Sequence, residues 1–267
     1  MLEHFCRDHR PRAAYPMRLA SRSCLAAIFV IALASVGPAQ TVNEGPLPPG
    51  TYRLEMIMAT VTHLPVFGSS KSASRSVSVV QIQREDSGLV QTHQVCDFRV
   101  LEDSKMVKMI FPEKFVAALA THRYPIALQK DADGWGYRAD LGLERIGYRA
   151  ETNDGQLPSR IDDPSVYDWD GDGFPGATLK LSVPFLADGE LYVVQRGHSI
   201  LNGRVTEPGK VEGSIEIRTF EQRVLGAKPS FLNRSPRIDP DPKESHFVMT
   251  LVPNDSTCES LRGRPNP

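Results

Sequence analysis

Three aspartates at alternate positions form the part of this sequence best suited to chemistry. Asp168, Asp170 and Asp172 lie in a segment that reads DWDGDGFPG over residues 168–176. Calcium prefers six to eight oxygen ligands, and carboxylates at the first, third and fifth positions of a tight loop point at one centre. The backbone carbonyl of Phe174, at the seventh position, would be the next ligand. We therefore predict a calcium site formed by Asp168, Asp170, Asp172 and Phe174.

This spacing resembles the D-x-D-x-D-G half of EF-hand, dockerin and integrin-type calcium loops, over about nine residues. Two positions depart from those loops, because Gly176 stands at the ninth and Leu179 replaces the bidentate glutamate at the twelfth. The closing ligands would then be water or other groups, with Asp162 and Asp163 just upstream. The alternative is a metal-free Asp/Gly turn, although adjacent carboxylates repel one another without a cation. The role expected of a bound ion is stability rather than catalysis.

A longer pattern resembles a group of exported bacterial β-rich proteins of uncharacterised activity. The segments DWDGDGFPGAT (168–178), YVVQR (192–196) and EQRVLGA (221–227) follow one another in the same order. The resemblance covers most of the mature chain and implies a secreted or periplasmic setting. It transfers no catalytic residue.

The motifs of common hydrolases are missing from the sequence. No G-x-S-x-G elbow occurs. The histidines of the mature chain lack the paired spacing of a zinc site, and we interpret each as a surface or strand-face residue: His63, His93, His122, His198 and His246. A glycoside-type hydrolase needs two carboxylates that meet in space and leaves no local motif, so it stays an alternative, with Asp162, Asp163 and Glu144 as the candidates. We predict no catalytic residue, and calcium is the one cofactor expected.

Three aromatic residues beside glycines suggest a second kind of site. Trp135, Tyr137 and Tyr148 could line a pocket for a carbohydrate or a small apolar ligand, since flat rings with space around them stack on sugars. The alternative is that these rings fill or cover the core.

The N-terminal segment has the layout of a secretory signal peptide. An apolar run over residues 25–33 follows two arginines and leads to small residues up to Ala39. The run is shorter than the ~20 apolar residues that a membrane-spanning helix needs. We predict a signal peptide over residues 1–39, cleaved after Ala39 or, alternatively, Ala34, with translation starting at Met1 or Met17. The mature protein is expected to be periplasmic or secreted.

Removal of that leader leaves Cys96 and Cys258 as the cysteines of the mature chain. Two cysteines in an oxidising compartment most simply form a disulfide, and two separate thiols are the alternative. Such a bond would tie the C-terminal tail to an early strand.

Strand patterns separated by turn residues occupy the mature chain. Alternating apolar and polar residues favour strands at 51–58, 76–83, 89–100, 105–111, 178–183, 190–196, 199–205, 211–224 and 246–252. We interpret the serine-rich stretch 68–74 as a break, residues 131–160 as weakly patterned, and 235–242 as a proline-rich crossing. Pro112 opens the one predicted helix, Glu113–Thr121. The pattern predicts a mainly β fold, an antiparallel barrel or sandwich with one short helix.

The net charge of the sequence and its division into segments bear on its partners and its function. The sequence has 31 basic and 32 acidic residues and a formal net charge of −1, so nothing favours nucleic acid or an anionic membrane as a partner. Residues 40–50 are predicted to be a linker, 51–260 a single β-rich domain, and 261–267 a flexible tail; a split near the acidic loop is the alternative. We expect an exported binding or structural module of the cell envelope with a calcium-stabilised loop. A lipocalin-like barrel around a small ligand and a glycoside-type hydrolase are the alternatives.

Overall fold

The computed structural model describes residues 45–64, 68–101, 108–119, 121–150, 155–182 and 188–262, all within the unit Asn43–Pro267. The predicted signal peptide lies outside the described residues, as do residues 263–267 of the predicted tail. The elements in chain order are β1 (Gly50–Leu64), β2 (Gly68–Glu85), β3 (Gly88–Val100), β4 (Lys108–Ile110), α1 (Glu113–Ala118), β5 (His122–Asp131), β6 (Gly134–Ile146), β7 (Ala177–Ser182), β8 (Gly189–Glu207), β9 (Lys210–Lys228), a 3-10 turn (Ser230–Leu232), β10 (Arg237–Pro240), β11 (His246–Val252) and α2 (Cys258–Leu261).

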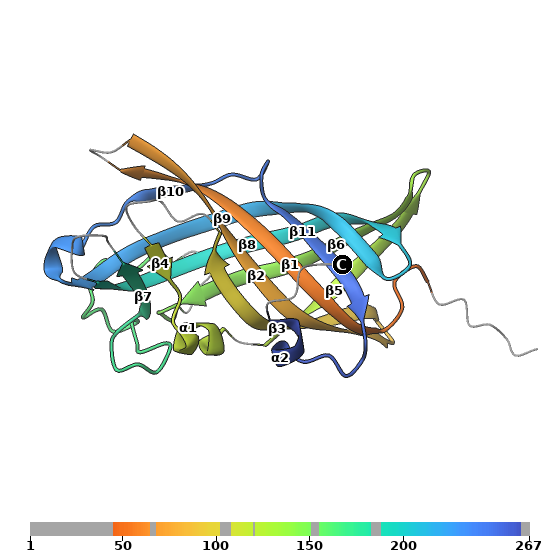
Figure 1. Ribbon diagram of the computed structural model, residues 1–267, viewed down its shortest axis with the longest axis horizontal. Helices are drawn as coiled ribbons and strands as arrows, with labels where there is room; N and C mark the ends of the chain where they lie inside the picture. The colour runs from red at the N-terminus through yellow and green to blue at the C-terminus, as the bar shows by residue number, and fades with distance from the viewer. Residues whose placement is uncertain are drawn as a thin grey trace, which may run out of the picture. The chain divides into compact units, whose positions relative to one another are not determined.

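The strands form one antiparallel sheet that closes on itself (Figure 1). Neighbouring strands follow the order β8–β6–β5–β3–β2–β1–β11–β9, and β9 pairs again with β8. The first residues of β8 pair with β7, and the residues that follow pair with β6. β7 pairs with β4 at its other edge. Closure gives each ring strand a partner on both sides over part of its length, although β3 pairs with β5 only over residues 89–93 and β9 pairs with β11 only over residues 210–214. The predicted mainly β, antiparallel fold is confirmed, and the sheet forms a barrel-like ring rather than a sandwich.

The inner face of β2 changes character along the strand. Ser74, Ser76 and Ser78 alternate along that face, and Val80 and Ile82 continue it into the core. The interpretation of residues 68–74 as a break is wrong, because β2 begins at Gly68 and pairs with β1 without a register shift from Gly68 to Ile82. Over residues 68–73 the pairing with β1 alone outweighs the weak strand preference of serine, and the pairing with β3 begins at Ser74.

The main hydrophobic core fills one part of the ring and draws on every ring strand. Leu54 of β1 and Phe247 of β11 are almost completely buried in it, and Leu47, which precedes β1, packs there as well. Tyr137 of β6 also belongs to this core, and its hydroxyl donates a hydrogen bond of 2.6 Å to Oε1 of Gln91. The phenol is therefore buried with its polar atom satisfied.

Three predictions about strand boundaries are corrected. Residues 190–196 and 199–205 belong to a single strand, β8, whose pairing with β9 shifts register between His198 and Ser199. The weakly patterned region contains β6, which forms a hairpin with β5, and β5 itself ends at the first residue of that region, Asp131. The proline-rich crossing 235–242 contains β10, which pairs with the second half of β1. In each case pairing with a neighbouring strand decides the structure more strongly than the local pattern does.

The predicted helix begins where expected and ends early. α1 starts at Glu113 directly after Pro112, but it ends at Ala118 rather than Thr121. Leu119 has an extended backbone (φ −61°, ψ 106°) and packs with Phe115 in a second hydrophobic cluster, formed mainly by α1, β7 and β8. The side chain of Leu119 is therefore packed into this cluster at the point where the helix ends.

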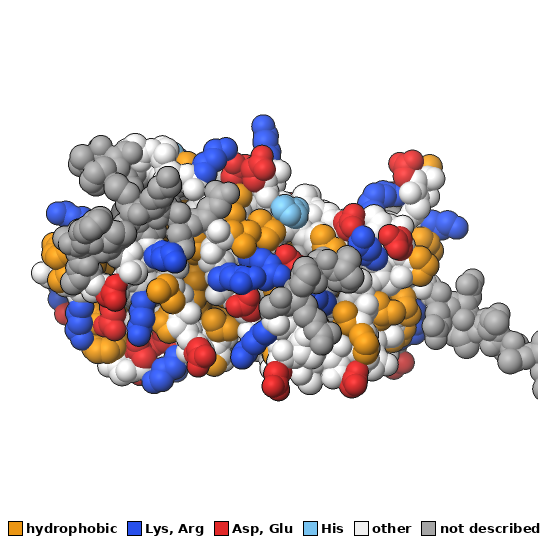
Figure 2. Space-filling model, in the orientation of Figure 1, with side chains coloured by type: hydrophobic (Ala, Val, Ile, Leu, Met, Phe, Trp, Pro, Cys, Tyr) orange, Lys and Arg blue, Asp and Glu red, His pale blue; other side chains and the backbone are white. Residues whose placement is uncertain are grey.

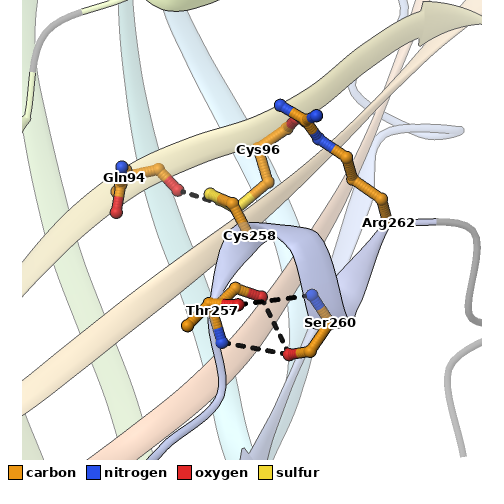
Figure 3. Close-up of a disulfide and its surroundings, with 6 residues drawn as sticks. All are labelled: Gln94, Cys96, Thr257, Cys258, Ser260 and Arg262. Atoms are coloured by element: carbon orange, nitrogen blue, oxygen red, sulfur yellow. Dashed lines mark hydrogen bonds between the residues drawn. A yellow bond between two sulfur atoms is a disulfide. The ribbon is translucent and has the colours of Figure 1, made fainter.

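α2 covers the outer face of β2 and β3 and holds the C-terminal end of the described chain (Figure 3). Cys258 of α2 forms a disulfide with Cys96 of β3, with the two Cα atoms 4.9 Å apart, so the predicted disulfide is confirmed. Arg262 donates a hydrogen bond of 3.1 Å to the carbonyl of Cys96, and Leu261 packs on valines of β2. The bond links two elements separated by 162 positions in the sequence.

On the face shown in Figure 2, basic and acidic side chains are interspersed. That mixture agrees with the near-zero net charge of the sequence. Within the described ranges, no helix has the length and hydropathy of a membrane span.

Candidate functional site

The acidic loop lies between β6 and β7 and is closed by its own backbone. The amide of Trp169 donates to the carbonyl of Gly176 (3.0 Å), and the amide of Gly176 donates to the carbonyl of Tyr167 (2.9 Å). Gly176 has a φ of +86°, and a Cβ there would lie 2.7 Å from the carbonyl oxygen of Val193. Conformation and space both exclude a side chain, so the loop requires glycine at this position.

Two of the three carboxylates bond to the backbone of the loop itself. Asp168 accepts hydrogen bonds from the amides of Asp172 (3.0 Å) and Gly173 (2.9 Å). Asp172 accepts one from the amide of Phe174 (2.8 Å). Bonds of this kind stabilise Asp/Gly turns in general. They are compatible with both the calcium loop and the metal-free turn.

Asp170 distinguishes this loop from a simple turn. Its side chain is buried, with 7% of the residue exposed, and its Oδ2 accepts a hydrogen bond from the amide of Thr178 (2.9 Å). Its Oδ1 is buried without a hydrogen-bond partner among the described residues. Burial, reinforced by repulsion from Asp172 and Asp168, raises the pKa of Asp170. One oxygen from each of the three carboxylates lies within 4.8 Å of the others, so the triad could hold a metal ion.

The structure does not bring the two upstream aspartates into this cluster. Asp162 pairs with Arg160 (2.7 Å), whose hydrogen bond lowers the pKa of that carboxyl. Asp163 accepts a hydrogen bond from the hydroxyl of Ser165 (2.7 Å). Both carboxylates are therefore engaged within their own turn. Ligation by the carbonyl of Phe174 stays a prediction.

A cavity of about 260 Å³ lies inside the ring, next to the main core. The end of β3, the segment around β4 and α1 contribute an apolar wall that includes Phe98, Phe111, Phe115 and Leu119. β1 and β2 contribute methionines and a row of hydroxyl groups that includes Thr60, Ser74, Ser76 and Ser78. Protein interiors rarely leave voids much larger than a water molecule. A cavity of this size and composition is therefore a candidate binding site.

Four polar side chains meet at this cavity from β3, β5 and β6. His93 and His122 are direct partners across β3 and β5. The ring of Tyr124 contacts His93 edge-on (5.1 Å between centroids) and stacks on His122 (6.0 Å). Nε2 of His122 lies 3.6 Å from Oε1 of Glu144. The sequence predicted strand-face histidines, but not that two of them would meet.

The surroundings lower the pKa of His93 and raise the pKa values of His122 and Tyr124. Burial, aided by the neighbouring His122, lowers the pKa of His93 to about 3. The nearby carboxylate of Glu144 raises the pKa of His122. Burial also raises the pKa of Tyr124, with the charge of Glu144 adding to the effect. At neutral pH, His93 is uncharged and Tyr124 keeps its proton.

The three aromatic residues predicted to line a ligand site do not line this cavity. Tyr137 is buried in the main core, and Tyr148 is buried in a separate cluster with Val194. Trp135 is half-buried, with Nζ of Lys130 5.9 Å from its ring centroid. For this cavity that prediction is wrong. The rings fill or cover the core, which was the alternative.

Two signals in the sequence point to the cavity. The first is the alternation of serines in a strand that continues into valine and isoleucine, which places small side chains where large ones would fill the ring. The second is Glu144, one of the carboxylates considered for glycoside hydrolysis, because it lines the cavity. Asp162 and Asp163, considered as its partners, lie in the exposed turn that precedes the acidic loop.

Comparison with known proteins adds little to these observations. No protein-family model matches the chain, and no curated protein matches it. Among solved structures, the chain is similar to DynF from the dynemicin biosynthesis pathway of Micromonospora chersina, with a TM-score of 0.36 and 10% sequence identity. That similarity covers 80% of this chain and 85% of DynF. A likeness at this level transfers no function.

Proposed function

We propose that this chain is an exported binding protein that takes up a small, largely apolar ligand inside its β ring. The observation that carries the proposal is the cavity of about 260 Å³, walled by Phe98, Phe111 and Phe115 and by the serines of β2. Ligand pockets are typically ~300–1,000 Å³ and mostly apolar with a few convergent polar groups. The cavity lies close to this range, which supports a small ligand and favours the lipocalin-like alternative over a purely structural module.

The leader and the disulfide support export. The signal peptide predicted over residues 1–39 would send the chain out of the cytoplasm, and residues 51–260 would be its single ligand-binding domain. Disulfides persist in oxidising compartments and are rare in the cytosol, so the Cys96–Cys258 bond is consistent with an extracytoplasmic location. We place the mature protein in the periplasm or outside the cell.

We further propose that Asp168, Asp170 and Asp172 hold a calcium ion with help from the carbonyl of Phe174. The unpartnered Oδ1 of Asp170 and the convergence of three carboxylates support a cation at this point. Oxygen-only ligands suit a hard cation, and sites of extracellular modules bind calcium with Kd of ~10⁻⁴–10⁻³ M. The role of the ion would be to stabilise the loop.

Contacts from the acidic loop reach α1, which lines the cavity. Nζ of Lys114 donates a hydrogen bond of 2.6 Å to the carbonyl of Gly171. The ring of Trp169 lies 5.2 Å from that of Phe115, centroid to centroid. A stabilised loop would therefore hold the helix that forms part of the cavity wall.

Fluorescence titration with 1-aminoanthracene, a neutral aromatic probe, tests the binding function. We expect saturable binding with an increase in emission. Ser76→Leu should weaken it at least tenfold, because the larger, branched side chain would occupy part of the cavity. Ser214→Leu, on the exposed face of β9, is the matched control and should bind like the parent protein. Circular dichroism checks that both variants fold. No saturable binding, or equal binding by folded Ser76→Leu, would overturn the proposal.

A further inference from the structure

The charged groups of the cavity are few and are already engaged. Among the described residues that line it there is no lysine, arginine or aspartate, and Glu144 is the one carboxylate. Glu144 faces His122, with Oε1 and Nε2 3.6 Å apart. When His122 is protonated, the two charges offset each other. The cavity therefore presents no permanent cation to a ligand.

His93 does not supply the missing positive charge. The residue is only 6% exposed and lies against the edge of Tyr124, with ring centroids 5.1 Å apart. Burial holds its pKa at about 3, so its ring is neutral at every pH near neutrality. An anion in the cavity would have only His122 as a cationic partner, and it would compete with Glu144 for it.

Ionised ligands of either sign are therefore disfavoured. A carboxylate would leave water without gaining an unshared cation, and an unpaired buried charge is strongly unfavourable. An ammonium group would have to displace His122 from Glu144. A neutral ligand meets neither obstacle, and its hydroxyl or carbonyl group can bond with the hydroxyls of Thr60, Ser74 and Ser76 along β1 and β2.

We infer that the cavity selects a neutral, largely apolar ligand that carries a hydroxyl or carbonyl group, and that it rejects carboxylates and amines of the same size. The inference rests on the proposed binding function and adds the chemical class of the ligand. The grounds are the apolar wall, the row of hydroxyls and the mutual pairing of the Glu144 and His122 side chains.

Calorimetric titration at pH 6.0 with three probes of one ring system tests the class: 2-naphthol, 2-naphthoate and 2-naphthylmethylammonium. At this pH the first is neutral and the others are ionised. We expect 2-naphthol to bind at least tenfold more tightly than either ion. If none of the probes binds, and 1-aminoanthracene does not bind either, the binding function itself fails and the inference fails with it. If 2-naphthoate or the amine binds as tightly as 2-naphthol, binding stands and the ligand class is wrong.

Glu144→Gln tests the reason for the selectivity. The substitution keeps the size of the side chain and removes the carboxylate that repels an anion in the cavity, so affinity for 2-naphthoate at pH 6.0 should rise at least threefold while affinity for 2-naphthol changes little. The matched control is Asp140→Asn. Asp140 pairs with His198 (2.7 Å), and neither residue lines the cavity. The control should leave both affinities unchanged. An unchanged naphthoate affinity in folded Glu144→Gln, or the same rise in the control, would contradict the inference.

Discussion

Replacing Asp170 with asparagine should have opposite effects on stability with and without calcium. The wild-type carboxylate is buried, one of its oxygens has no hydrogen-bond partner among the described residues, and two other carboxylates lie close by. Asparagine keeps the shape and can still accept the hydrogen bond from the amide of Thr178. Its NH₂ group can donate to the carboxylates of Asp168 or Asp172. Without a cation, the substitution therefore removes repulsion; with a cation, it removes a ligand.

The expected magnitudes are large enough to measure. A buried polar atom left unsatisfied costs ~1–3 kcal/mol, so the Asp170→Asn variant should be more stable than the wild type by ~1 kcal/mol in chelator. With a Kd of ~10⁻⁴ M, about 10 mM calcium is a hundredfold excess and should stabilise the wild type by ~2.7 kcal/mol. At ~2–4 °C per kcal/mol for a domain of this size, the wild-type Tm should rise by about 5–10 °C, and the variant Tm should barely move.

Thermal unfolding followed by circular dichroism, in chelator and in calcium, measures both effects. The matched control is Asp86→Asn in the exposed turn between β2 and β3, which should respond to calcium as the wild type does. A wild-type Tm that does not change with calcium would refute the metal site. A variant that is less stable than the wild type by the same amount in both conditions would show that Asp170 has only a structural role.

Three further predictions concern stability. The pKa of His93 is about 3 in the folded protein against ~6.5 when unfolded, so below pH 6.5 the unfolded chain binds more protons, and the free energy of unfolding decreases as the pH is lowered, by up to ~1.4 kcal/mol per pH unit. Urea unfolding at pH 7, 6 and 5 should show a smaller decrease for His93→Phe than for the wild type, and the same decrease as the wild type for the exposed His246→Phe. Equal decreases in all three proteins would contradict this prediction. Cys258→Ser removes the disulfide that closes a loop of 162 positions, and it should lower the free energy of unfolding in guanidinium titrations by up to ~5 kcal/mol. The wild-type protein with its disulfide reduced should lose the same amount. An unchanged unfolding midpoint would show that the disulfide is dispensable for stability. Gly176→Ala should lower the free energy of unfolding by more than ~3 kcal/mol, because the new Cβ would meet the carbonyl of Val193. Gly173 also has a positive φ but has open space around it, so Gly173→Ala should lower the free energy of unfolding by only ~1 kcal/mol. Similar decreases in the two variants would mean that backbone conformation alone matters.

The fold class could be predicted because many strands bury one face and expose the other. Phe247 and Met249 are buried in β11 and alternate with exposed or half-buried neighbours, and this strand was predicted with its observed bounds. β5 was missed although Tyr124, Ile126 and Leu128 alternate with exposed neighbours, because Pro125 lies inside this run and a proline argues against a strand. β8 and β9 form a hairpin across Pro208 and Gly209, which are turn residues. The pairings of β1 with β11 and of β6 with β8 join segments far apart in the sequence and leave no local signal.

The two candidate sites differ in how far the sequence could reveal them. Asp168, Asp170 and Asp172 are close in the chain, and a tight loop is enough to bring their side chains together. His122 and Glu144 lie on different strands and meet only through the register of β5 with β6 and of both with their neighbours. Spacing in the sequence therefore predicts the acidic loop, whereas for the cavity it shows only the alternating serines of β2 and not the polar side chains that meet there.

Methyl NMR of the protein labelled with [methyl-¹³C]methionine tests the central claim most directly. Met56, Met58 and Met109 line the cavity, whereas Met249 is completely buried in the main core and serves as an internal control. On titration with 1-aminoanthracene, we predict saturable shifts of the three cavity methyl signals at one common Kd, with the Met249 signal nearly unmoved. Saturable binding that leaves the three cavity methyl signals in place would contradict a ligand site inside the ring.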